Sequence, residues 1–152
     1  MRKLIFILPI LVFGCGSSEP AEGPVFVSEG VALGGYDPVA YFEQNEAKKG
    51  VEAESLSYDG FTYFFSSTKN RNLFQEDPEK YLPAYGGWCA YAVAEASNRM
   101  APDPELWQIQ DGQLQLFYDD WQTRMFGSLK EAWNEDADNY KVKADANWEK
   151  MN

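Results

Sequence analysis

Hydrophobic and polar residues alternate along two stretches of the chain, and each stretch contains an Asp-Gly pair. The first stretch covers residues 54–67 around Asp59-Gly60, and the second covers residues 106–118 around Asp111-Gly112. Alternation with a period of two is typical of strands that bury one face, and Asp-Gly between two such runs favours a two-residue turn. The sequence therefore predicts two β-hairpins.

Helix signals appear before and after the first hairpin. Asp37 precedes Pro38, and together they predict a helix over residues 38–42 with the aspartate as its N-cap. Ser67 is the predicted N-cap of a second helix over residues 68–76, which ends where an Asp-Pro pair follows. Both helices are short and lie close to the hairpin in sequence.

The second half of the chain predicts further helices. Residues 90–96 form a helical turn or two, and Asp119 or Asp120 caps a longer helix. Apolar residues four positions apart on one face of that helix are Trp121, Met125, Leu129 and Trp133, and those of the last helical segment are Tyr140, Ala144 and Trp148. The fold class expected from these elements is α+β, a small antiparallel sheet of two hairpins packed with helices.

The first residues read as a targeting segment rather than as part of this fold. Arg2 and Lys3 precede a short apolar run, which predicts a signal peptide over residues 1–14. The sequence "LVFGC" resembles the lipobox of bacterial lipoproteins, and this resemblance implies acylation of Cys15, a tether over residues 15–29 and a single domain over residues 30–152. We therefore expect a lipid-anchored, exported protein that faces the periplasm, with the outer membrane favoured.

Composition narrows the chemistry that the exported part can carry out. Without Arg2 and Lys3, the 13 basic residues become 11 against 24 acidic residues, a net charge of −13, which disfavours nucleic acid as a partner. The chain has no histidine, and this excludes Ser-His-Asp and Cys-His catalysis. Of the two cysteines, Cys89 is left as a free thiol if Cys15 carries lipid.

Three longer motifs carry a family resemblance. The stretches "GVALGGYDPVAYF", "YDGFTYFFSSTKNRNLFQEDPEKYLPAYGGWCAYAVA" and "KADANW" together resemble the YHS-domain proteins, over roughly residues 30–148. The resemblance implies a compact α+β domain. In metal-associated relatives two cysteines lie at a strand-to-helix junction, and by that resemblance Ser66 and Asn70 occupy their places here. A hydroxyl and an amide are weak ligands for soft metals, so we expect no soft-metal site at this junction.

A site for a ligand or a metal ion near Cys89 is the remaining possibility. The ligand-binding candidates are Tyr36, Asp37, Tyr85, Cys89 and Tyr91, and a bound metal ion would take Cys89 and Asp37 as candidate ligands. Each candidate also has a structural interpretation, because Asp37 can be an N-cap and Cys89 a small buried hydrophobe. Tyr63 and Tyr85 are among the tyrosines that either line a pocket or form an aromatic core.

Three functions follow, and the sequence leaves them open. The leading hypothesis is a non-catalytic module that binds a metal or small ligand and is attached to a membrane through its N-terminal lipid. The second is a redox enzyme that uses the Cys89 thiol, which would need a depressed thiol pKa. The third is an accessory protein that binds another envelope protein and has no small ligand.

Overall fold

The structure, a computed structural model, describes residues 23–152. The predicted signal peptide, Cys15 and the first part of the tether lie outside the described residues. In chain order the elements of residues 23–152 are β1 (Val27–Ser28), β2 (Val31–Ala32), η1 (Leu33–Gly35), α1 (Pro38–Glu43), β3 (Val51–Tyr58), β4 (Phe61–Phe65), α2 (Thr68–Glu76), α3 (Pro78–Tyr81), η2 (Ala84–Gly87), α4 (Ala90–Ala96), β5 (Asp103–Gln110), β6 (Gln113–Phe117), α5 (Trp121–Phe126), α6 (Leu129–Glu135) and α7 (Ala137–Met151). The α+β fold class is confirmed.

Both predicted hairpins are present, β3-β4 and β5-β6. Their turns have positive φ at both central residues, 48° and 82° at Asp59 and Gly60, and 52° and 77° at Asp111 and Gly112. Two such residues define the turn whose twist matches that of the paired strands. Within residues 23–152 the hairpins remain separate two-stranded sheets, and the short pair β1-β2 forms a third.

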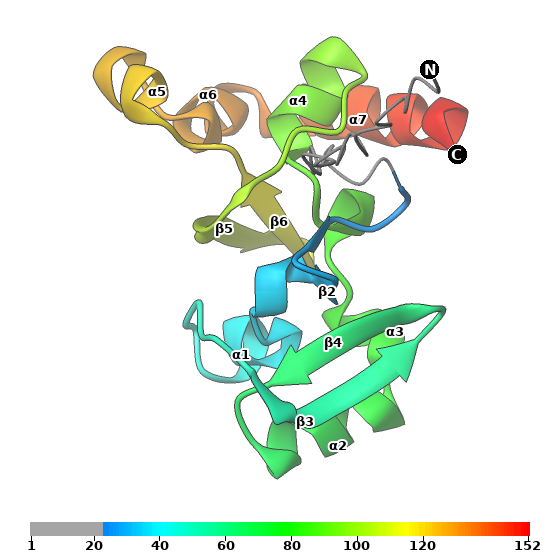
Figure 1. Cartoon of the computed structure of the whole chain (residues 1–152). Coiled ribbons are helices and arrows are strands. Elements are labelled where there is room, and N and C mark those ends of the chain that lie inside the picture. The colour runs from blue at the N-terminus through cyan, green and yellow to red at the C-terminus, as the bar shows by residue number, and fades with distance from the viewer. Residues whose placement is uncertain (1–22) are drawn as a thin grey trace, which may run out of the picture.

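Two hydrophobic clusters form the core. The N-terminal cluster includes Tyr41, Tyr63, Phe65, Phe74, Leu114 and Leu116, and the C-terminal cluster includes Trp88, Cys89, Val93, Phe117, Trp133 and Ala144. Strand β6 contributes to both clusters because alternate residues of a strand point to opposite faces. Figure 1 shows β6 in the middle of the molecule, with α1 and the β3-β4 hairpin on one side and α4, α6 and α7 on the other.

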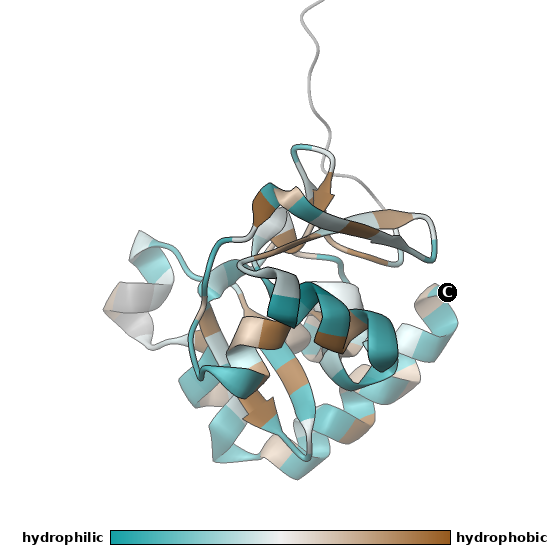
Figure 2. Ribbon diagram, turned by 90° about the horizontal axis from the view of Figure 1, so that it is seen from below, coloured by the Kyte–Doolittle hydropathy of each residue, from teal (hydrophilic) through white to brown (hydrophobic). Residues whose placement is uncertain are grey.

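Both faces of strand β6 are covered, and this explains why one of its polar residues is buried. Gln115 alternates with two leucines and would reach solvent in a sheet with one exposed face, but it is fully buried here. Its Oε1 atom accepts a hydrogen bond of 2.9 Å from the Gln108 Nε2 atom in β5. Helices that pack on a core have one hydrophobic face and one hydrophilic face, and Figure 2 shows both kinds of residue along the helices.

The helices predicted over residues 38–42, 68–76 and 90–96 are present as α1, α2 and α4, whereas α3 was not predicted and one later prediction is wrong. The expected continuous helix through Trp121, Met125 and Trp133 is two helices, α5 and α6, separated at Gly127. Ser128 caps α6 in a capping box with Glu131, which starts a new helix with a different orientation. As a result the Trp121 side chain is 67% exposed while Trp133 is buried.

Residues 137–151 form the last helix, α7, in agreement with the spacing of its apolar residues. Ala144 is fully buried, and Tyr140 and Trp148 pack against the C-terminal cluster. No helix among residues 23–152 combines the length and apolar character needed to cross a bilayer.

Candidate functional site

The junction of β4 and α2 encloses the carboxylate of Asp37. Asp37 is fully buried at the N-terminus of α1. Its Oδ1 atom accepts hydrogen bonds from the backbone N–H groups of Val39 and Ala40, at 2.9 and 3.3 Å. Its Oδ2 atom accepts three more, all of 2.7 Å, from the Ser66 N–H, the Ser66 hydroxyl and the Asn70 amide.

This arrangement shows what Ser66 and Asn70 do at the strand-to-helix junction. Ser66 and Asn70 direct their donors at a carboxylate that the chain itself provides, so Asp37 connects α1 to the β4-α2 junction. Five donors occupy the lone-pair positions that a metal ion would need. Across residues 23–152, no group of three or more His, Cys, Asp or Glu side chains is placed to hold a metal ion.

Cys89 lies in the C-terminal cluster and is fully buried. It precedes α4, and its backbone N–H donates a hydrogen bond of 3.0 Å to the Met100 carbonyl. Burial raises the pKa of the Cys89 thiol, because a thiolate is poorly solvated in an apolar interior. A raised pKa is the opposite of what a redox-active thiol requires at neutral pH.

The glycines before Cys89 make room for the chain's own N-terminal segment. The Phe26 N–H donates to the Gly86 carbonyl at 2.8 Å, and the Trp88 indole N–H donates to the Gly23 carbonyl at 2.9 Å. A Cβ atom on Gly86 would come within 1.7 Å of the Pro24 carbonyl oxygen. Gly86 is therefore required for a close approach of two backbone segments.

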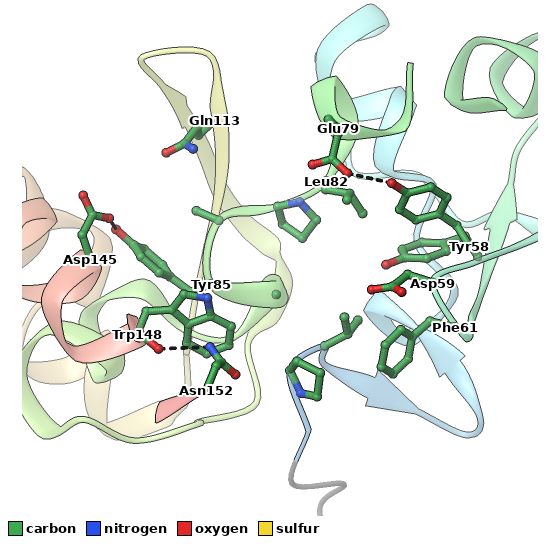
Figure 3. Close-up of a pocket in the computed structure, with 16 residues that line it drawn as sticks. Tyr58, Asp59, Phe61, Glu79, Leu82, Tyr85, Gln113, Asp145, Trp148 and Asn152 are labelled. Atoms are coloured by element: carbon green, nitrogen blue, oxygen red, sulfur yellow. Dashed lines mark hydrogen bonds between the residues drawn. The ribbon is translucent and has the colours of Figure 1, made fainter. Parts of the chain in front are cut away.

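A pocket of about 430 Å³ lies between the β3-β4 hairpin and α7. Figure 3 shows its two walls, one with Tyr58, Asp59, Phe61 and Glu79, and the other with Tyr85, Asp145, Trp148 and Asn152. Tyr63 also lines it, and Pro24 and Val25 lie at its edge. The volume is in the range typical of small-molecule sites, and aromatic side chains contribute to both walls.

Two tyrosine–carboxylate pairs lie on opposite sides of this pocket. The Tyr58 hydroxyl donates to Glu79 Oε1 at 2.7 Å, and the Tyr85 hydroxyl donates to Asp145 Oδ1 at 2.9 Å. The hydrogen bond to Glu79 raises the pKa of Tyr58, while burial is the main cause of the raised pKa of Tyr85. Both hydroxyls therefore keep their protons at neutral pH and remain donors to the carboxylates.

The segment that carries Tyr85 is conformationally unusual. Tyr85, Gly86 and Gly87 have consecutive positive φ angles of 54°, 59° and 86°. A bulky residue in the left-handed region costs on the order of 1–2 kcal/mol relative to its ordinary conformation. In this conformation the centre of the Tyr85 ring lies 6.2 Å from that of the Trp148 ring, and the Tyr85 hydroxyl hydrogen-bonds to Asp145.

One of the five predicted ligand-binding residues lines this pocket. Tyr85 lines the pocket, whereas Tyr36, Asp37, Cys89 and Tyr91 do not. Tyr36 donates to Glu105 Oε1 at 3.1 Å, and the Tyr91 ring packs 5.2 Å from the Tyr140 ring. Tyr58, Glu79, Asp145 and Trp148 were not predicted, because they come from three elements that only the tertiary fold brings together.

Comparison with known proteins finds one family model that matches part of the chain. The YHS domain model matches residues 41–85, which include the end of α1, the β3-β4 hairpin, α2 and α3. The match ends at Tyr85, so it covers Tyr58, Glu79 and the first wall of the pocket but not α7. Neither the curated proteins nor the solved structures contain a match to this chain.

Proposed function

We propose that this YHS domain-containing protein is a non-catalytic module that binds a small ligand in the pocket between the β3-β4 hairpin and α7. The observation that carries the proposal is the pocket itself, about 430 Å³ with tyrosine, phenylalanine and tryptophan side chains on its walls. Tyr63 and Tyr85 are buried in the core, and they also border this space together with Tyr58, Phe61 and Trp148. Rings that border a cavity of this size offer stacking surface to a small molecule.

The proposed site differs from the one expected around Cys89 and Asp37. The hydrogen bonds of the Asp37 carboxylate are all made within the protein, and the Cys89 thiol is buried with a raised pKa. These contacts support structural roles for both residues. Tyr85 is retained in the proposed site, because it lines the pocket and hydrogen-bonds to Asp145.

Membrane attachment through an acylated Cys15 is part of this proposal and rests on the signal-peptide and lipobox patterns of residues 1–15. A single acylated cysteine of the bacterial type carries more than one chain, which suffices for stable anchoring. Mass spectrometry of the N-terminal peptide should find the acyl-cysteine. A mature chain that begins at another residue without lipid would refute the attachment.

Binding in the pocket can be tested with three simple probes of different charge, phenol, benzoate and benzylamine. The full chain in a nonionic maltoside detergent is titrated with each probe while amide chemical shifts are recorded. We expect at least one probe to shift residues around Tyr58, Tyr85 and Trp148 more than the rest of the protein.

A pair of substitutions makes that test specific. Ala84 lines the pocket, so Ala84→Phe should fill it and abolish the shifts, while Ala146→Phe on the exposed surface of α7 should preserve them. If Ala84→Phe does not fold, the location of the shifts in the unmodified chain still shows whether the probes bind in the pocket. Shifts scattered over the surface for all three probes would overturn the proposed binding function.

A further inference from the structure

We infer that the pocket between the β3-β4 hairpin and α7 selects an organic cation, an alkylated amine or quaternary ammonium group. This inference rests on the proposed binding function and names its ligand class. It combines two independent properties of the pocket, the charge of its polar residues and the aromatic character of its walls.

The polar residues of the pocket favour a positive ligand. Its lining includes three carboxylates, Asp59, Glu79 and Asp145, and no lysine or arginine. Lys141 forms an ion pair of 2.7 Å with Asp145 from outside the lining and balances part of that charge. Among the side chains that the structure describes, no lysine or arginine forms such an ion pair with Asp59 or Glu79. The Arg99 guanidinium lies 5.2 Å from the centre of the Trp148 ring and adds positive charge beside that wall. A carboxylate-lined cleft attracts cations and repels anions.

The aromatic rings decide which kind of cation fits. Five aromatic residues line the pocket, Tyr58, Phe61, Tyr63, Tyr85 and Trp148. The faces of such rings attract alkylated ammonium groups, and these groups are weakly hydrated, so they lose little hydration on entry. A small metal ion would need several oxygen ligands close together, and no such group of acidic side chains occurs among the described residues.

The hydroxyls of Tyr58 and Tyr85 support the same ligand class. Each donates a hydrogen bond to a carboxylate of the pocket, to Glu79 and Asp145 respectively. A phenol whose proton is directed at a carboxylate has an electron-rich oxygen and ring and offers no donor to an anionic ligand. Each pair therefore adds negative potential on its own side of the pocket.

The position of the N-terminal segment allows two sources for such a ligand. Pro24 and Val25 lie at the edge of the pocket, and at most about 30 Å of chain can separate them from Cys15 at roughly 3.5 Å per residue. On a membrane-anchored chain the pocket would lie near lipid headgroups, some of which carry ammonium groups. The same chemistry also fits a free solute.

A matched pair of probes tests the selection for charge. Choline carries a quaternary ammonium group, and 3,3-dimethylbutanol has the same shape with a carbon atom in place of nitrogen. We expect the full chain in nonionic maltoside detergent to bind choline at least tenfold more tightly, as measured by calorimetry and by amide shifts at the pocket. Glycerophosphocholine distinguishes the sources: binding as tight as that of choline indicates a lipid headgroup, and weaker binding indicates a free solute.

Substitutions then assign the effect to the pocket. Glu79→Gln keeps an oxygen that can accept from Tyr58 and removes one charge, and it should weaken choline binding about fivefold. The control is Glu76→Gln, an equal loss of charge at an exposed position of α2 outside the pocket, which should leave binding unchanged. An equal effect of both variants would show that only the overall charge matters and would overturn the inference.

The outcomes separate this inference from the proposed function. Equal affinities for choline and dimethylbutanol would reject the cation selectivity while leaving a working binding pocket. Binding of phenol or benzoate at the pocket, with no binding of choline, would also reject the cation selectivity and leave a working binding pocket. The binding function itself fails only if none of the neutral, anionic and cationic probes shifts the pocket residues more than the rest of the protein.

Discussion

The β4-α2 junction and the pocket beside α7 both contain carboxylates, but they differ in what surrounds those groups. At the junction the protein itself provides five hydrogen-bond donors to Asp37. In the pocket Glu79 and Asp145 each accept from one tyrosine hydroxyl and border a space of about 430 Å³. A carboxylate whose bonding capacity is used within the fold stabilises it, whereas carboxylates around an aromatic cavity remain able to act on a ligand.

The largest effect that separates these two roles is expected from Asp37→Ala. It would leave buried donors of Ser66 and Asn70 without an acceptor and remove the N-cap of α1. Because each unsatisfied buried group costs about 1–3 kcal/mol, the free energy of unfolding should fall by about 3 kcal/mol or more. Urea denaturation measures the loss.

A second Asp-Pro pair provides the control for this substitution. Asp77 precedes Pro78 and α3 as Asp37 precedes Pro38 and α1, but its side chain is exposed and makes no capping hydrogen bond. Asp77→Ala should therefore change stability by less than about 0.5 kcal/mol. Equal losses in the two variants would contradict the structural role of the Asp37 carboxylate.

An intermediate effect is expected from Gly86→Ala, which tests how the N-terminal segment is held at the pocket edge. The new Cβ atom would clash with the Pro24 carbonyl, and φ at this residue is +59°. We expect a loss of about 2 kcal/mol from strain and displaced backbone, measured by urea denaturation.

Gly112→Ala is the matched control, because Gly112 has a φ of +77° but no atom within 4 Å of the added Cβ. It should show only the cost of the positive φ, about 1 kcal/mol. The Gly86 variant should also shift the amide resonances of residues 24–26. Identical stability losses and unmoved resonances would mean that the close approach is unimportant.

The smallest effect concerns Cys89 and compares a buried thiol with a reactive one. Because burial raises its pKa above the ordinary value of 9.0, the folded state holds the thiol proton more tightly than the unfolded state. Its contribution to stability is therefore complete below about pH 9 and declines as the pH rises through the folded-state pKa. Cys89→Ala should lose stability less steeply than the unmodified chain above that pH.

Thiol labelling gives the complementary measurement. At neutral pH Cys89 should react with iodoacetamide in the folded protein far more slowly than in urea, with the labelled peptides separated so that Cys15 is scored by itself. Rapid labelling of the folded protein would revive the redox hypothesis and would remove the distinction between the buried core and the open pocket.

Local patterns were sufficient to predict much of the fold. Asp59-Gly60 and Asp111-Gly112 predicted both hairpins because the turn requires positive φ at adjacent residues, and Ser67 predicted the start of α2 because its side chain accepts from the Asn70 N–H. The continuous helix through Trp121 and Trp133 was wrong, although Ser128 and Glu131 carry the capping-box pattern that divides it. The apolar spacing continues through this region, but Gly127 ends α5 and the Ser128 cap begins α6.

The candidate site was much less predictable. Tyr85 was the one predicted ligand-binding residue that lines the pocket, and its partner Asp145 is 60 positions away in the sequence. Tyr58 and Glu79 are separated by 21 positions and come from different elements. No local period or motif relates such residues, because the distance between them depends on how the hairpin, η2 and α7 pack.

The two Asp-Pro pairs show where the information in the sequence ends. By itself the sequence predicted that a helix begins after Asp37-Pro38, since proline fixes φ and aspartate can accept from the first N–H groups. At Asp77-Pro78 it predicted only the end of α2, although α3 begins there with Pro78 in its first turn. Only the tertiary structure decided that Asp37 is buried against Ser66 and Asn70 while Asp77 faces solvent. The physical reason is that hydrogen-bonding and dihedral preferences act between neighbours in the chain, whereas burial depends on segments that are distant in sequence and meet only in the folded protein.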